Sequence, residues 1–98
     1  MQNKSMLEST VESKLKALVK RIGGQSYKWA GAKGVPDRIV LLPGGVVVFV
    51  EIKSSSGRLT ELQQVVGERL KSLGCNYYVL RGAEGLEVFE QYLTGLMW

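Results

Sequence analysis

The chain contains no histidine, and Cys75 is its only cysteine. Without histidine it cannot build a Cys/His zinc site or the Ser-His-Asp and Cys-His arrangements of nucleophilic catalysis. A lone cysteine also gives no disulfide framework. Any chemistry carried by this chain must therefore use carboxylates, lysine, polar groups or a metal ion held by oxygen ligands.

Long apolar runs are missing as well. No stretch approaches the ~20 apolar residues that a bilayer span needs, and the start of the chain, residues 1–5, lacks the apolar segment of a signal peptide. We therefore expect a cytoplasmic protein. The 98 residues, 45% hydrophobic and 22% charged, predict one domain over residues 1–98 with a single core. A domain of this size has a thin margin of stability, so pairing with a second copy would help it.

Positive charge is concentrated in the first part of the chain. Residues 1–38 hold eight Lys and Arg against three acids, whereas residues 39–98 hold five basic and six acidic residues. A basic half on a small domain favours a polyanionic partner such as nucleic acid, although an uneven but inert surface charge is the simpler explanation.

Periodicity and capping patterns predict helices and strands in the order α-β-β-β-α-β-α. Ser5 with Glu8, and Thr60 with Gln63, fit capping boxes, so we expect helices over 5–22 and from 60 to Gly74. The run 46–53 is apolar on both faces, which is typical of a central, buried strand. The other predicted elements are strands over 25–30, 37–42 and 76–80 and a helix over 84–96. An α/β fold with a mixed sheet flanked by helices follows.

A predicted hairpin places charged side chains together. If residues 43–45 form a three-residue loop, Asp37 lies directly opposite Glu51, with Cβ atoms about 4.5–5.5 Å apart, and Lys53 shares their face. Two opposed carboxylates repel unless a cation lies between them, and oxygen ligands suit Mg²⁺ or Mn²⁺. A two-residue loop would instead put the carboxylates on opposite faces. A salt bridge between Lys53 and one acid would need no metal.

These residues also carry a family resemblance. Pro36-Asp37 and, after thirteen intervening residues, Glu51-Ile52-Lys53 resemble the PD-(D/E)XK nuclease signature. With Glu12, Gly34 and Gln63, the chain from about residue 8 to residue 80 resembles the virus-type replication-repair nuclease (VRR-NUC) family, whose compact, stand-alone members are typical of phages. The resemblance implies a restriction-endonuclease-like αβββαβ core, here followed by an extra C-terminal helix, and the host-cell cytoplasm as location if the chain is phage-encoded.

The resemblance implies a role for each matching residue. Asp37 and Glu51 match the metal-binding acids, and the main-chain carbonyl of Ile52 completes that site. Lys53 matches the lysine that positions or activates the attacking water and steadies charge on the scissile phosphate. Two further catalytic candidates follow, Glu12, which acts through a metal-bound water, and Gln63, which touches the metal or lysine neighbourhood.

Simpler roles remain open for several candidates. Glu12 fits a solvated helix face, and Gln63 fits a helix cap that does nothing more. Five residues near the predicted site are candidates for DNA contact, although lysines there could be free and a glycine could simply make a turn. They are Lys28, Lys33, Gly34, Arg38 and Arg58.

The resemblance implies a DNA endonuclease that uses Mg²⁺ or Mn²⁺ and acts as a homodimer on branched DNA, in the manner of a Holliday-junction resolvase. A two-fold dimer would present two sites to opposed strands. The alternatives are a fork, flap or single-strand nuclease and a catalytically inert nucleic-acid-binding module. The apolar C-terminus is a candidate dimer interface or ordinary core packing; its residues are Leu93, Leu96, Met97 and Trp98.

Overall fold

The computed structural model describes residues 7–97, and its elements follow the predicted order. The sheet has the strand order β1-β2-β3-β4, in which β1, β2 and β3 are antiparallel neighbours and β4 runs parallel to β3. The prediction of a mixed sheet flanked by helices is therefore confirmed. The elements are α1 (Glu8–Arg21), β1 (Gln25–Lys28), β2 (Arg38–Leu42), β3 (Val46–Lys53), α2 (Glu61–Ser72), β4 (Asn76–Arg81), the 3-10 turn η1 (Ala83–Gly85) and α3 (Leu86–Met97).

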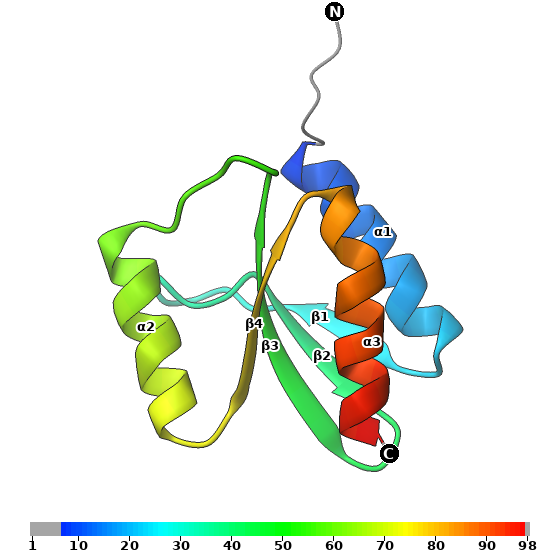
Figure 1. Ribbon diagram of the computed structural model, residues 1–98. Coiled ribbons are helices and arrows are strands. Elements are labelled where there is room, and N and C mark those ends of the chain that lie inside the picture. The colour runs from blue at the N-terminus through cyan, green and yellow to red at the C-terminus, as the bar shows by residue number, and fades with distance from the viewer. Residues whose placement is uncertain (1–6, 98) are drawn as a thin grey trace, which may run out of the picture.

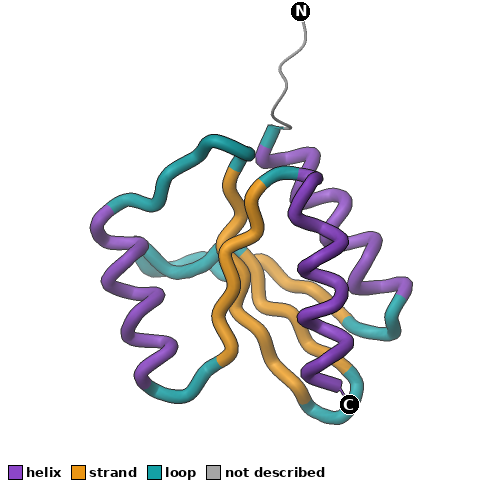
Figure 2. Tube along the Cα trace, viewed as in Figure 1, coloured by secondary structure: helices purple, strands orange, loops and turns teal. Residues whose placement is uncertain are grey.

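The helices cover the sheet in layers, with α2 on one face and α1 and α3 on the other (Figure 1, Figure 2). Successive side chains of a strand point to opposite faces. In β3 the even-numbered residues Val48, Val50 and Ile52 enter the core beneath α1 and α3, so Glu51 and Lys53 face the side of α2. The rest of this core is formed by Val11, Leu15, Leu18, Val19, Val40, Leu42, Leu80, Phe89 and Leu93.

The β2–β3 hairpin has the predicted register. Leu42 pairs with Val46 and Arg38 with Val50, so residues 43–45 are the three-residue connection. β3 lies between β2 and β4, which confirms it as a central strand. The ladder ends at Arg38, one residue before the expected Asp37–Glu51 pair, because the chain turns away from β3 at that point.

The two predicted capping boxes have different outcomes. In α2, the Thr60 hydroxyl accepts from the Gln63 backbone N–H at 3.1 Å, and the Gln63 side-chain oxygen accepts from the Thr60 N–H at 2.9 Å. This box is confirmed. In α1 the N-cap position is taken by Leu7, whose side chain makes no capping bond. The expected N-cap residue, Ser5, lies outside the described residues.

The C-terminal helix uses its apolar side for its own fold. Leu93 is fully buried, and Leu96 and Met97 pack against the core as half-buried side chains. This arrangement matches ordinary core packing, and Trp98 lies outside the described residues. Within residues 7–97, no helix has the length and apolar character to cross a membrane.

The loop between β1 and β2 is fastened to α2 at Gly34. This residue has φ +83°, and a Cβ built there would lie 2.6 Å from Cγ of Leu62 and 3.1 Å from a methyl group of Val66. Both the backbone conformation and the close approach require glycine. The contact fixes the segment that leads into Pro36 and Asp37.

Gly67 on α2 allows a similarly close approach, and it gives a test with a matched control. A Cβ there would lie 2.7 Å from the Tyr77 ring, whereas one on Gly95 of α3 would meet nothing within 4 Å. Alanine favours a helix over glycine by about 1 kcal/mol, but overpacking costs typically 1–3 kcal/mol. We therefore expect Gly67→Ala to lower the free energy of unfolding and Gly95→Ala to raise it, as measured by urea denaturation. Equal gains for both variants would show that the Tyr77 contact is readily relaxed.

Candidate active site

The charged side chains predicted to meet do so at the end of β3. Glu51 is 2% exposed, and the Lys53 side chain is 12% exposed. The Lys53 Nζ lies 3.8 Å from Oε2 of Glu51. A carboxylate and an ammonium group this strongly buried are uncommon in a small domain, because each loses its hydration. Their retention at one strand end indicates a functional cluster.

Asp37 is held in this cluster by two main-chain contacts. Its Oδ2 accepts a hydrogen bond from the Ile52 N–H at 2.7 Å, and its carbonyl oxygen accepts from the Trp29 N–H at 3.0 Å. The Asp37 carboxylate thus supplies the acceptor for the Ile52 N–H where the β2 ladder has ended. This contact places the carboxylate beside the β3 backbone with little freedom to turn away.

The environment of Glu51 opposes its ionisation. Burial and, after it, the charge of Asp37 raise the pKa of Glu51 from its ordinary 4.5 to about 7, even though the Lys53 ammonium lowers it. The lysine therefore offsets only part of the unfavourable energy of two neighbouring carboxylates. A carboxyl group whose charge is this poorly compensated is ready to receive a cation.

Gln63 connects the site to the start of α2. Its side-chain oxygen closes the capping box with Thr60, and its Nε2 donates to Oε2 of Glu51 at 3.0 Å. A helix cap alone would not place this amide on a buried carboxylate. Gln63 therefore both caps the helix and fixes the Glu51 carboxylate.

The donor set fits a hard divalent cation that keeps water ligands. Asp37 and Glu51 supply carboxylate oxygens, and the backbone of Ile52 lies beside both. Within residues 7–97 no three His, Cys, Asp or Glu side chains gather closely enough to form a metal cage of their own. Mg²⁺ is commonly bound by one or two carboxylates and several waters, so two acids and a carbonyl suffice for it.

Glu12 of α1 forms an ion pair with Arg38 of β2. Its Oε2 lies 3.0 Å from Nη1 of Arg38, which is buried and also donates to the hydroxyl and carbonyl oxygens of Ser26 at 2.9 and 3.1 Å. Arg38 shares its face of β2 with the core residue Val40, away from the face of Glu51. The contacts of both residues join α1, β1 and β2 and leave no free guanidinium for DNA.

Replacing Glu12 tests this structural role. Glu12→Gln should lower the free energy of unfolding by about 3 kcal/mol, because it leaves the buried Arg38 charge without its partner. If the cluster at Asp37 and Glu51 binds a divalent ion, its affinity for Mg²⁺ should stay near that of the unmodified chain. Denaturation and a Mg²⁺ binding titration measure the two effects. A strongly weakened Mg²⁺ affinity with unchanged stability would instead place Glu12 at the metal.

The other candidates for DNA contact differ in exposure. Lys28, Lys33 and Arg58 are exposed, whereas Gly34 is engaged with α2. Arg81 is an exposed cation that the sequence reasoning missed. It pairs with Lys53 across the parallel β3–β4 ladder, and its Nε donates to the Gly57 carbonyl at 3.2 Å. The only sequence signal for it was a cation at the end of a predicted strand.

The fold and site together define an α/β protein with two carboxylates and a lysine at the end of a central strand, and comparison with known proteins agrees with this fold. Residues 1–84 match the family model described as VRR-NUC domain. The chain is also 41% identical over 75 residues to "Putative nuclease p44" of Acyrthosiphon pisum secondary endosymbiont phage 1, a match that covers 74% of this chain and 81% of that protein. The chain belongs to the VRR-NUC family of nuclease domains.

Solved structures support the same assignment. One, described as a VRR_NUC domain, superposes with a TM-score of 0.77 at 30% identity and covers 87% of this chain and 96% of its own. A second, described as a VRR_NUC domain protein, has a TM-score of 0.70 at 23% identity over 93% of this chain and 91% of its own, and shows the shared fold.

Proposed function

We propose that this protein is a Mg²⁺- or Mn²⁺-dependent endonuclease of the PD-(D/E)XK type that hydrolyses phosphodiester bonds in DNA. The observation that carries the proposal is the cluster of Asp37, Glu51 and Lys53 at the end of β3, with Glu51 buried and its pKa raised to about 7. The family and the phage relative named as a nuclease support it. The proposed location is the cytoplasm, that of the host cell if the chain is phage-encoded.

The residues of the site divide the work. Asp37, Glu51 and the Ile52 carbonyl would hold the divalent ion, which polarises a phosphoryl oxygen and lowers the pKa of a bound water. The Lys53 ammonium, held beside Glu51, would stabilise the negative charge that develops on the scissile phosphate. Gln63 keeps the Glu51 carboxylate oriented through its amide. This division of labour uses no histidine.

We further propose that the substrate is branched DNA and that the active form is a homodimer. A two-fold dimer would face a four-way junction with two sites of matching symmetry. The exposed apolar side chains Tyr27, Leu41 and Val47, on one face of β1, β2 and β3, favour contact with a second copy. Light scattering should give about twice 10.8 kDa for the chain and 10.8 kDa for Leu41→Glu. A monomeric unmodified chain at micromolar concentration would contradict the dimer.

The enzymatic proposal is tested by offering several DNA forms to the purified protein. Labelled four-way junction, fork, duplex and single-stranded DNA are incubated with EDTA, Mg²⁺ or Mn²⁺. Paired, metal-dependent nicks in the junction that are lost in Lys53→Met support the junction nuclease. Cleavage of forks or single strands alone would support the metal-dependent nuclease but contradict the proposal that it resolves four-way junctions. DNA binding without lysine-dependent cleavage under any metal would show an inert nucleic-acid-binding module.

A further inference from the structure

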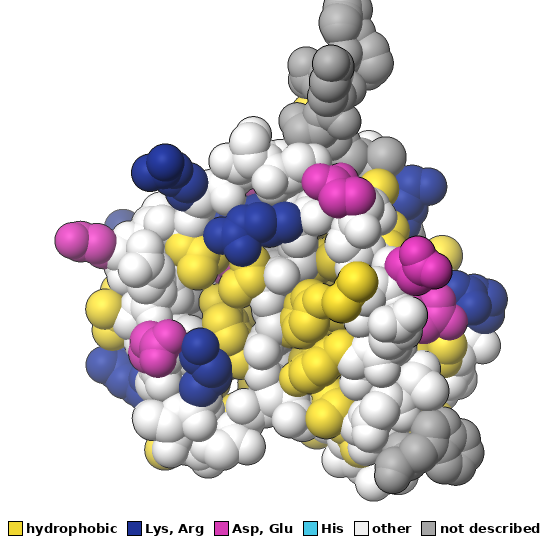
Figure 3. Space-filling model, viewed as in Figure 1, with side chains coloured by type: hydrophobic (Ala, Val, Ile, Leu, Met, Phe, Trp, Pro, Cys, Tyr) yellow, Lys and Arg dark blue, Asp and Glu magenta, His cyan; other side chains and the backbone are white. Residues whose placement is uncertain are grey.

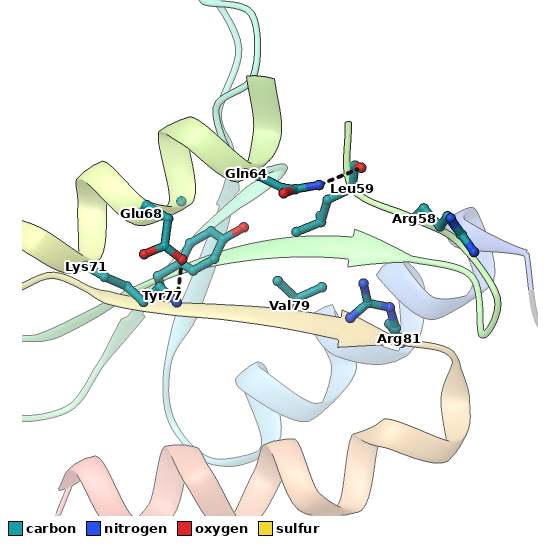
Figure 4. A pocket seen from close by; sticks show the side chains of 9 residues that line it. Arg58, Leu59, Gln64, Glu68, Lys71, Tyr77, Val79 and Arg81 are labelled. Atoms are coloured by element: carbon teal, nitrogen blue, oxygen red, sulfur yellow. Dashed lines mark hydrogen bonds and ion pairs between the residues drawn. The ribbon is translucent and has the colours of Figure 1, made fainter. Parts of the chain in front are cut away.

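A pocket of about 510 Å³ lies between α2 and β4, beside the proposed active site. Figure 4 shows Tyr77 and Val79 along β4, Arg81 at its end, Leu59 and Arg58 on the loop before α2, and Gln64 on the helix. The volume falls in the range of small-ligand sites. In Figure 3, hydrophobic side chains are visible between α2 and β4, with basic side chains at both ends.

The pocket adjoins the catalytic cluster through the parallel β3–β4 ladder. Val79 pairs with Glu51, and Arg81 pairs with Lys53, so these four side chains point to the same face. Neighbouring strands lie about 4.8 Å apart. A polymer whose phosphate lies at Lys53 therefore has its adjoining unit within reach of the pocket.

The chemistry of the walls favours a nucleotide. Leu59 and Val79 provide apolar surface for a flat base, and the exposed guanidinium groups of Arg58 and Arg81 can stack on a base or pair with phosphate. Gln64 donates its amide to the Leu59 carbonyl, which leaves its amide oxygen for a base edge. Lys71 is already paired with Glu68 at 3.1 Å, whereas Arg58 and Arg81, which form no ion pair within residues 7–97, lie at the end nearest the active site.

We propose that this pocket receives one unpaired nucleotide of the DNA, next to the phosphate that is cut. This inference rests on the proposed nuclease function and adds the feature of the substrate that the enzyme selects. A base within a duplex is stacked and paired, so it enters such a pocket only after leaving the helix. Forks and flaps offer unpaired nucleotides, and the base pairs at the centre of an opened junction have lost one stacking neighbour. The pocket thereby favours DNA at a branch over continuous duplex.

The first test locates the unstacked base directly. A four-way junction carries 2-aminopurine at successive positions around the cut, and the slowly cleaving Lys53→Met protein binds it in Mg²⁺ while the fluorescence is read before appreciable cleavage. Fluorescence of 2-aminopurine rises when the base leaves the stack. We expect a several-fold rise at one position adjoining the cut. No rise at any position, with binding intact, would overturn the proposal and leave a surface that contacts only phosphate.

The second test fills the pocket from its exposed rim. Gln64→Phe puts an aromatic ring into the space, and Gln91→Phe makes the same change on the exposed face of α3, far from the pocket. Removing the base at the responsive position should weaken binding about tenfold for the unmodified chain and for Gln91→Phe. Removing the same base should change the DNA affinity of Gln64→Phe little, because the phenylalanine ring already fills the pocket. Equal effects of base removal on both variants would contradict occupancy of the pocket by the base.

The two proposals can fail separately. Suppose that cleavage depends on metal and is lost in Lys53→Met, but that no fluorescence rise and no selective effect of Gln64→Phe are seen. The nuclease proposal would then stand, and the proposal that the pocket binds a nucleotide would be wrong. If the fluorescence rise and the effect of base removal are seen but no cleavage occurs, the pocket binds a nucleotide and the nuclease proposal is wrong. Circular dichroism of both phenylalanine variants establishes that each is folded.

Discussion

Lys53→Met is expected to lower the rate of DNA cleavage by about 10²- to 10³-fold, the usual loss when one group that stabilises transition-state charge is removed. The methionine keeps the volume of the lysine stem in a position where only 12% of the side chain is exposed. The concentration of Mg²⁺ that gives half-maximal rate should not rise, because a positive charge beside the site has been removed. Single-turnover cleavage across a Mg²⁺ titration measures both quantities.

Asp37→Asn is the matched comparison, because it alters a proposed metal ligand and keeps the size of the side chain. It should raise the half-maximal Mg²⁺ concentration as well as lower the rate. Lys16→Met, an exposed lysine on α1, serves as the control for loss of one charge. A raised Mg²⁺ requirement in Lys53→Met, with a normal rate once saturated, would contradict the assigned role of the lysine.

Glu51→Gln is expected to stabilise the metal-free protein at neutral and alkaline pH. The pKa of Glu51 is about 7 in the folded chain and 4.5 ordinarily, so the folded state binds a proton more tightly than the unfolded state. Stability is therefore lost as the pH rises from 4.5 through 7. The variant should gain about 3 kcal/mol at pH 8 and less than about 1 kcal/mol at pH 5.

Urea denaturation in EDTA at several pH values tests this expectation, with Glu87→Gln, an exposed acid on α3, as the control. Mg²⁺ should raise the stability of the unmodified chain and leave Glu51→Gln unaffected, because a ligand stabilises only a folded state that binds it. An equal free energy of unfolding for the two chains at pH 8, or a gain that grows on acidification, would contradict this expectation. It would show that ionisation of Glu51 does not destabilise the folded, metal-free protein.

The central part of the fold could be predicted because local rules agree there. The Pro43-Gly44-Gly45 break set the hairpin register, and that register brought Asp37, Glu51 and Lys53 to one end of the sheet. The capping pattern at Thr60 likewise predicted the start of α2 and placed Gln63 in its first turn. Each of these inferences depends on residues close together in the chain.

The remaining features depend on contacts between distant segments. The bond from Glu12 to Arg38 joins α1 to β2, and its existence follows from how that helix lies on the sheet. The position of Arg81 beside Lys53 follows from the parallel β3–β4 register, which has no turn to define it. The spacing of residues along the chain does not predict contacts between such distant segments. These contacts follow only once the positions of the helices on the sheet and the β3–β4 register are known.

The hairpin turn at residues 43–45 has a practical consequence. Its three residues are exposed, Gly44 and Gly45 have φ of +86° and +78°, and a Cβ built on either would meet nothing within 4 Å. The strands carry this turn to the opposite end of the sheet, about 17 Å or more from the cluster at Asp37 and Lys53. A fluorescent dye or a fused DNA-targeting module joined there would extend outward from the sheet. The protein could thus be redirected to chosen sequences with its reactive end unchanged.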